Sequence, residues 1–244
     1  MWMLVASVKD RAMSKRSKRY VSVSRKVERG KYYSLSEGVE KLKALASAKF
    51  DESVDVALKL GINPRKSDEQ VRGTVVLPHG TGRNVRIVVL AREDKWGEAK
   101  EAGADYVGES EIIEQIEQGW VDFEVLITEP GMMREVGKLG KILGPRKLMP
   151  SPKAGTVTTN LAQAVRSIKK GKVGFMSDKH GMINLCVGKS SFAQKDLVDN
   201  VGTLLTSIFK EKPSSSKGRF FRSLFLSSTM GPGVRVDIQS LHLI

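Results

Sequence analysis

Two stretches near opposite ends of the chain have a two-residue period, with strict alternation in the first and an apolar face opposite a hydroxyl-bearing face in the second. The first stretch is residues 54–60, and the second is residues 220–229. Because successive side chains of a strand point to opposite faces, each stretch predicts a strand with one face in a core. The second strand is unusual because its other face is rich in hydroxyl groups. That face carries Phe221, Ser223, Phe225, Ser227 and Thr229.

The middle of the chain has a different pattern. Residues 85–91 form a continuous apolar run, which is typical of a strand buried on both faces. Strands that alternate with helices predict a parallel sheet and a Rossmann-like unit. After the first run we expect helices at 96–102, 112–118, 132–143 and 161–170, with strands at 105–107 and 123–128.

On either side of this region the pattern predicts paired strands and helices. Ser34 and Glu37 form a capping-box signature for a helix that ends near Lys49 and Phe50. We expect the strand at 54–60 to form a hairpin-type pair with 71–77, and 173–175 to pair with 183–187 in the same antiparallel style. A second capping signature at 191–194 precedes a helix with one apolar stripe.

These patterns predict two domains. The first is a discontinuous α+β domain of the split β-α-β type, an antiparallel sheet with helices built from residues 13–80 and 172–244. The second is an inserted α/β Rossmann-like domain of residues 81–171, and the two crossings near Gly80 and Gly171 are a predicted hinge. We expect residues 1–12 to be a disordered extension, with Met13 as the more natural start, and we predict no signal peptide.

Charge is distributed unevenly along the 244 residues. The net charge is +14, yet residues 92–124 contain 3 basic and 11 acidic residues, so the remainder carries +22. Residues 13–31 contain eight Lys or Arg against the single acid Glu28, which reads as a basic arm. Because Lys and Arg release counterions from phosphates, the basic remainder is the predicted nucleic-acid surface. A plain solubilising surface is the alternative.

Composition excludes several classes of protein. The single Cys186 cannot form an intrachain disulfide, so we predict a cytoplasmic protein in which this thiol is a small buried residue. No apolar stretch approaches the ~20 residues that a membrane helix needs.

Catalytic motifs are also absent. The glycine- and lysine-rich stretch 137–153 lacks the spacing of a phosphate-binding loop, because Leu139 stands where Ser or Thr is required. The glycines at 80–82 precede a strand, whereas a dinucleotide loop follows one. His79, His180 and His242 lie far apart and have no other ligand at metal spacing. We therefore predict no cofactor, no metal and no catalytic residue.

The turn Thr229-Met230-Gly231 is the best candidate contact. Glycine lets a backbone lie close to a partner, methionine fills irregular gaps, and threonine can bond to sugar or phosphate. RNA offers 2′-hydroxyls and shape, which suits such contacts. A plain hairpin turn is the alternative. Taken alone, Phe50 reads more readily as the apolar contact that follows a helix end.

Several motifs together resemble a known family. They are Val71-Arg-Gly-Thr-Val-Val-Leu-Pro-His-Gly80, Lys138-Leu-Gly-Lys-Ile-Leu-Gly-Pro-Arg146 with Met149-Pro150, Pro152-Lys-Ala-Gly-Thr-Val157 and Ser228-Thr-Met-Gly-Pro232. Over residues 13–238 the chain is similar to the bacterial large-subunit ribosomal protein L-one family, the protein of the mobile stalk beside the exit site.

The resemblance implies a non-enzymatic, ribosome-bound cytoplasmic protein, monomeric on the ribosome, whose discontinuous domain grips a stem-loop region of large-subunit ribosomal RNA (rRNA). It also implies repression of translation through its own operon messenger RNA leader, and assistance in releasing deacylated transfer RNA from the exit site. Carried over by position, the RNA-binding residues are Lys49, Phe50, Ser53, Ser223, Thr229, Met230 and Gly231.

The chain departs from the family pattern at two positions. Family members usually have glycine where this chain has Lys147, and often Asn at the position of Ser151. A positive φ at Lys147 would cost on the order of 1 kcal/mol or more. The tail 239–244 has no family counterpart. Two rival functions remain, an enzyme that uses the Rossmann-like unit and a protein that coats nucleic acid without specificity.

Overall fold

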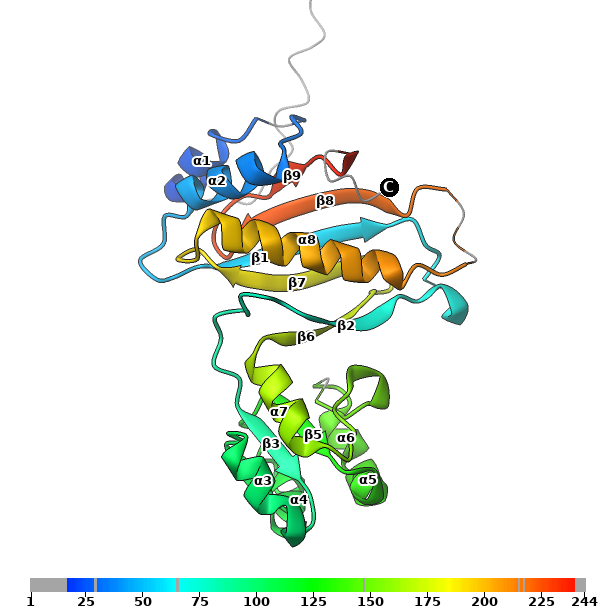
Figure 1. Cartoon of the computed structure of the whole chain (residues 1–244). Helices are drawn as coiled ribbons and strands as arrows, with labels where there is room; N and C mark the ends of the chain where they lie inside the picture. The colour runs from blue at the N-terminus through cyan, green and yellow to red at the C-terminus, as the bar shows by residue number, and fades with distance from the viewer. Residues whose placement is uncertain are drawn as a thin grey trace, which may run out of the picture.

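The computed structural model describes residues 17–239 apart from residues 29, 65, 147, 215 and 217. The predicted extension 1–12, the departure at Lys147 and the tail from residue 240 lie outside the described residues. Figure 1 shows a larger part built from both ends of the described chain and a smaller part from its middle, with a two-stranded ribbon between them.

The larger part, here called the four-stranded part, contains an antiparallel sheet of order β7-β1-β8-β9. Its two central strands come from distant segments of the chain. Helices α2 and α8 cover one face (Figure 1). The elements are α1 (Lys18–Ser24), α2 (Leu35–Leu45), β1 (Ser53–Leu60), β7 (Met182–Lys189), α8 (Gln194–Lys210), β8 (Phe221–Ser228) and β9 (Val234–Val236).

Alternation along β1 and β8 builds the core of this part. Val54, Val56 and Leu58 are almost fully buried and pack with Leu224 and Leu226 under the two helices. The intervening positions of both strands are half-buried on the opposite face of the sheet. We call that opposite face, which no described helix covers, the open face. It includes Ser223, Phe225 and Ser227, as the sequence predicts. The prediction is wrong for Phe221, which is buried in the core because the register between β1 and β8 shifts next to it.

The smaller part, here called the three-stranded part, contains a parallel sheet of order β4-β3-β5. Strand β3 is buried at every position, because separate apolar clusters pack on its two faces. The elements are β3 (Ile87–Leu90), α3 (Trp96–Glu101), β4 (Tyr106–Gly108), α4 (Ser110–Glu117), β5 (Val125–Thr128), α5 (Met133–Val136), α6 (Gly140–Leu143) and α7 (Leu161–Lys169).

A two-stranded ribbon joins the parts. Strands β2 (Arg72–Val76) and β6 (Lys172–Met176) pair antiparallel, and Val75 and Phe175 pack into the core of the four-stranded part. The two chain crossings meet next to the ribbon. Gly171 has a φ of +99°, and a Cβ on it would lie only 2.5 Å from the Cα of Gly80. This contact requires glycine at position 171.

Some local predictions are confirmed. Ser34 and Glu37 form the predicted capping box at the start of α2. The predicted hairpins are wrong, because β1 pairs with β7 and β8 while β2 pairs with β6. Alternation identifies the buried face of a strand but not its partner.

Three further predictions are corrected. The expected helix 132–143 is broken into short α and 3₁₀ pieces, since glycines at 137 and 140 disfavour a continuous helix. Helix α8 starts without a side-chain cap, because its N-cap is Ala193; Ser191 lies two residues earlier, and its hydroxyl donates to Asp51. Cys186 is half-buried rather than buried.

Candidate nucleic-acid interface

Pairing of β1 with β8 brings two loops together at one end of these two central strands. The backbone N–H of Thr229 donates to the carbonyl of Ser53 at 3.1 Å. The N–H of Ser53 in turn donates to Thr229 Oγ1 at 3.0 Å. The loop 47–51 and the turn 229–231 therefore lie side by side, and we call them the two-loop surface.

A buried carboxylate fastens the two loops to each other. Glu52 is only 1% exposed. Its Oε1 accepts hydrogen bonds from the backbone N–H groups of Ser47 and Ala48 at 3.0 and 2.9 Å. Its Oε2 accepts one from the N–H of Met230 at 3.0 Å. One side chain thus fixes the backbones of both loops.

These hydrogen bonds control the ionisation of Glu52. Burial alone would raise the pKa of its carboxyl group, but the N–H groups of Met230 and Ala48 favour the charged form. The pKa accordingly lies below its ordinary value of 4.5. Glu52 is therefore a carboxylate at neutral pH and holds the loops as an anion.

The loop that carries Phe50 is also held from its other side. The Asp51 carboxylate accepts hydrogen bonds from the hydroxyls of Ser190 and Ser191 at 2.9 and 2.8 Å. The hydroxyls of Ser191 and Ser190 lower the pKa of Asp51 below its ordinary value of 3.8. Both residues that follow Phe50 are thus anchored.

Phe50 points outward from this anchored loop. Its side chain is 55% exposed. Helix α2 ends at Leu45, so the interpretation of Phe50 as an apolar contact at the helix end is wrong. Lys49 and Met230 are also exposed, and Met230 is 48% accessible. A large exposed ring on a fixed backbone is suited to contact with a partner.

Arg19 bridges the two loops on the outside. It lies in helix α1, so this part of the predicted basic arm is helical rather than extended. Arg19 Nη1 donates to Ser47 Oγ at 2.8 Å, and its Nη2 donates to the carbonyl of Met230 at 3.2 Å. Sequence reasoning missed Arg19, Asp51 and Glu52 as parts of the site. The acidic pair Asp51 and Glu52 just before a predicted strand was the one available signal in the sequence, and nothing local indicated a partner for Glu52.

The predicted site residues do not all lie together. Lys49, Phe50, Thr229, Met230 and Gly231 belong to the two-loop surface. Ser53 is 9% exposed, and the guanidinium of Arg83 lies 3.5 Å from its Oγ. Its backbone supports Thr229.

Ser223 lies at the far end of β8. Six residues at about 3.3 Å each place it roughly 20 Å from Thr229 along the strand. It shares the open face with Phe225 and Ser227. The open face therefore connects Ser223 to the two-loop surface.

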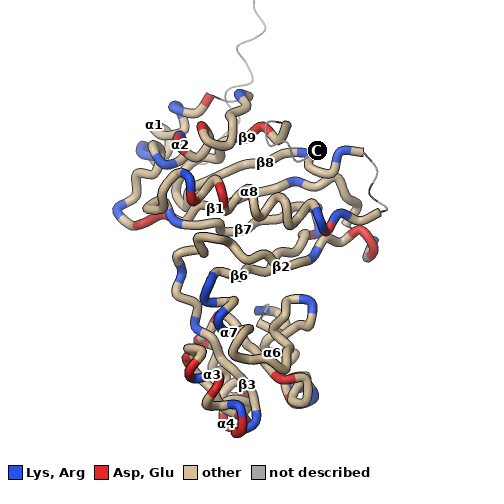
Figure 2. The backbone as a smooth tube through the Cα atoms, in the orientation of Figure 1, with Lys and Arg blue, Asp and Glu red and all other residues tan. Residues whose placement is uncertain are grey.

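The three-stranded and four-stranded parts differ in the charge of their side chains. Figure 2 shows acidic positions gathered on α3 and α4 of the three-stranded part, and basic positions near α1 and at the loops of the four-stranded part. Basic side chains thus lie beside the two-loop surface. They include Arg19, Lys49 and Lys189, whose Nζ donates to the Asp51 carbonyl at 3.4 Å.

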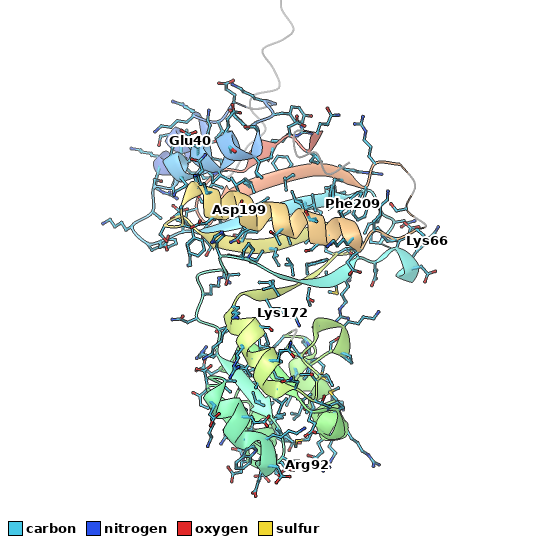
Figure 3. The ribbon with its side chains drawn as sticks, in the orientation of Figure 1. Glu40, Lys66, Arg92, Lys172, Asp199 and Phe209 are labelled. Atoms are coloured by element: carbon cyan, nitrogen blue, oxygen red, sulfur yellow. The ribbon has the colours of Figure 1, made fainter. Side chains whose placement is uncertain are left out.

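The described residues hold no group of three or more side chains placed to bind a metal ion. His79 lies against α8, with Nδ1 3.7 Å from Asp196 and Nε2 3.6 Å from Asp199 (labelled in Figure 3). Among the helices of residues 17–239 that the structure describes, none combines the length and apolar character needed to span a bilayer.

The chain matches the model of the ribosomal protein L1p/L10e family over residues 42–232. It is 52% identical over 229 residues to the "Large ribosomal subunit protein uL1" of Kosmotoga olearia, covering 94% of this chain and 99% of the relative. It is 50% identical over 231 residues to the protein of that name from Protochlamydia amoebophila, covering 95% and 98%.

The chain therefore belongs to a class of mixed α/β ribosomal proteins and is not an enzyme. Its family is that of ribosomal protein L1p/L10e. The resemblance found from the motifs is confirmed, and the rival assignment to a Rossmann-like enzyme is set aside.

Proposed function

We propose that the chain is a constituent of the large ribosomal subunit, bound to the ribosome in the cytoplasm, and that its two-loop surface binds a stem-loop region of large-subunit rRNA at the mobile stalk. The observation that carries this proposal is the Glu52 carboxylate, which joins the Phe50 loop to the Met230 turn. Because this surface is arranged before RNA binds, little conformational entropy is lost on binding. Less of the contact energy is then offset by the cost of ordering the loops.

The proposed contacts divide by chemistry. Phe50 supplies an exposed ring for stacking, and Met230 fills an irregular gap. The Thr229 hydroxyl bonds to the Ser53 backbone and keeps one lone pair that can accept a hydrogen bond from a ribose hydroxyl, and Gly231 lets the RNA backbone approach. Lys49 and Arg19 supply charge near phosphates. Ser53 acts by positioning Thr229, and Ser223 extends the contact along the open face.

Specific binding separates this function from nonspecific coating of nucleic acid. The test measures affinity for the ribosomal stem-loop and for an unrelated hairpin of equal length at the same salt concentration. The proposal expects the stem-loop to bind at least about 1,000-fold more tightly, the low end of the ratio for sequence-specific nucleic-acid binding proteins. Equal affinities would establish the coating function instead.

The two parts are proposed as two domains. Residues 13–80 and 172–244 form the RNA-binding domain, residues 81–171 form the inserted Rossmann-like domain, and the contact of Gly80 with Gly171 marks the hinge between them. Swinging at this hinge would let the stalk follow deacylated transfer RNA as it leaves the exit site. Single-molecule distances between the domains test this, and distances that stay equal in free and RNA-bound protein would remove it.

Regulation is proposed from the same surface. A messenger RNA leader with the shape of the ribosomal stem-loop would bind the same two-loop surface. Once the ribosomal sites are filled, the remaining protein would bind the leader and repress translation of that message. Competition tests this directly, since the ribosomal stem-loop must displace the operon leader from the protein. Simultaneous binding of both RNAs would contradict it.

A further inference from the structure

The open face carries aromatic side chains that the two-loop surface does not use. Phe225 of β8 lies directly opposite Arg235 of β9 in the register of the sheet. The segment before α2 adds to the edge beyond β9, because Tyr33 donates its N–H to the Arg235 carbonyl and bridges to Val236. Tyr33 is buried, so its neighbour Tyr32 falls on the open face.

Tyr32, Arg235 and Phe225 form one continuous row. The guanidinium carbon of Arg235 lies 4.2 Å from the centre of the Tyr32 ring and 5.9 Å from that of Phe225. Arg235 Nε is buried and makes no hydrogen bond to any described residue. Tyr32 is 55% exposed. The row therefore ends in an accessible ring rather than in a covered core residue.

A basic cavity of about 670 Å³ opens beside this row. Tyr32, Arg235 and Ser223 line it, together with Lys212 and Arg222. Lys212 Nζ lies about 6 Å from the ring centres of Phe209 (labelled in Figure 3) and Phe220. Aromatic rings and cations that line one cavity suit a nucleotide, which offers a flat base and a negative phosphate.

We propose that the row Tyr32–Arg235–Phe225 is a stacking platform for an unpaired RNA base, with Lys212 and Arg222 facing its phosphate. Aromatic side chains on an open sheet face stack splayed-out bases in other RNA-binding sheets. The platform crosses β8 at Phe225, four residues or roughly 13 Å along the strand from Thr229. It rests on the proposed function and extends it, because the same RNA would cross the open face from one end to the other.

The test compares Tyr32→Leu, which removes the ring, with Tyr32→Phe, which keeps it. The probe is the ribosomal stem-loop with its flanking unpaired nucleotides, and circular dichroism confirms folding. Since one base stacked on an aromatic ring is worth about 5- to 140-fold in affinity, Tyr32→Leu should weaken binding within that range. Tyr32→Phe should bind within about two-fold of the wild type. Tyr106→Leu, a matched change at an exposed tyrosine of the three-stranded part, should also have no effect.

The outcomes separate the two proposals. If the wild type prefers the stem-loop and Phe50→Leu weakens it, but Tyr32→Leu binds as the wild type does, the platform is overturned and the proposed function stands. If the wild type shows no preference for the stem-loop, the proposed function itself fails. Should Tyr32→Leu misfold, photo-crosslinking of the wild type to 4-thiouridine RNA decides, and no crosslink at Tyr32 overturns the platform.

Discussion

Glu52 Oε2 accepts a hydrogen bond of 3.0 Å from the backbone N–H of Met230, although 178 positions separate the two residues in the chain. The same carboxylate binds the N–H groups of Ser47 and Ala48 through its other oxygen. The geometry of the proposed RNA contact thus depends on a residue that itself is buried. This dependence leads to the first two predictions.

Glu52→Gln should weaken both folding and RNA binding. If the amide oxygen keeps its bonds to residues 47 and 48, the NH₂ group faces the Met230 N–H, and two donors cannot bond. We expect a loss of about 1–3 kcal/mol in the free energy of unfolding, measured by urea titration at neutral pH. Affinity for the ribosomal stem-loop should fall at least about five-fold, which corresponds to roughly 1 kcal/mol.

Glu69→Gln is the matched control. Glu69 is also buried, and its carboxylate accepts the N–H of Asn63 at 2.7 Å. It lies away from the two-loop surface, so this variant should lose stability but keep its affinity for RNA. Wild-type affinity in a folded Glu52→Gln variant would show that Glu52 does not position the interface.

Stability should depend on pH through Glu52. Its folded-state pKa is depressed below 4.5, so its stabilising contribution is present above that value and is lost as pH falls through the folded-state pKa. Wild type and Glu52→Gln should therefore differ most at neutral pH and converge below about pH 4.5. Urea titrations of both proteins across this range measure the difference between their free energies of unfolding. Carboxylates that both proteins share contribute to each value and largely cancel from the difference. A difference that stays constant with pH would rule out this linkage.

Thr229→Val should cost stability as well as affinity. The Thr229 hydroxyl accepts the Ser53 N–H at 3.0 Å, and valine leaves that donor without its partner. We expect a loss of about 1–3 kcal/mol on unfolding and a weaker stem-loop complex. Thr229→Ser keeps the hydroxyl and should behave nearly as the wild type does. If a folded Thr229→Val variant binds the stem-loop as tightly as the wild type, Thr229 makes no polar contact with RNA.

Gly171→Ala should be costly because of the contact with Gly80. The new Cβ would lie 2.5 Å from the Gly80 Cα. Gly119 is the matched control, since its φ of +103° is similar to the +99° of Gly171 but nothing lies within 4 Å of its added Cβ. Backbone strain alone should cost Gly119→Ala about 1 kcal/mol, and steric overlap should add a further 1–3 kcal/mol or so at Gly171. Equal losses in thermal or urea unfolding would show that the crossings are not in tight contact.

The sequence predicted some local features correctly, because their causes lie within a few residues. The Ser34 and Glu37 capping box is one example, and the hydroxyl face of Ser223 and Ser227 is another. Strand partners were predicted wrongly because β1 joins strands that lie more than 100 positions further along the chain.

The sequence predicted only some residues of the candidate site, because the others gain their roles through contacts between distant segments of the chain. The motif resemblance indicated Phe50 and Met230, but Glu52 gained its role only when folding brought Met230 to it. The exposure of Phe50 also reversed its local interpretation, since α2 ends five residues earlier. Tyr32 became a candidate because it lies beside the edge strand β9. No local pattern in the sequence indicates that position.

The affinity of Phe50→Leu for the ribosomal stem-loop shows whether the two-loop surface binds RNA. Phe50 is exposed, so the variant should fold as the wild type does. Stem-loop affinity should fall about 5- to 140-fold while affinity for an unrelated hairpin stays unchanged, because only the specific complex stacks a base on this ring. Unchanged stem-loop affinity in the folded variant would contradict the claim that the two-loop surface binds RNA.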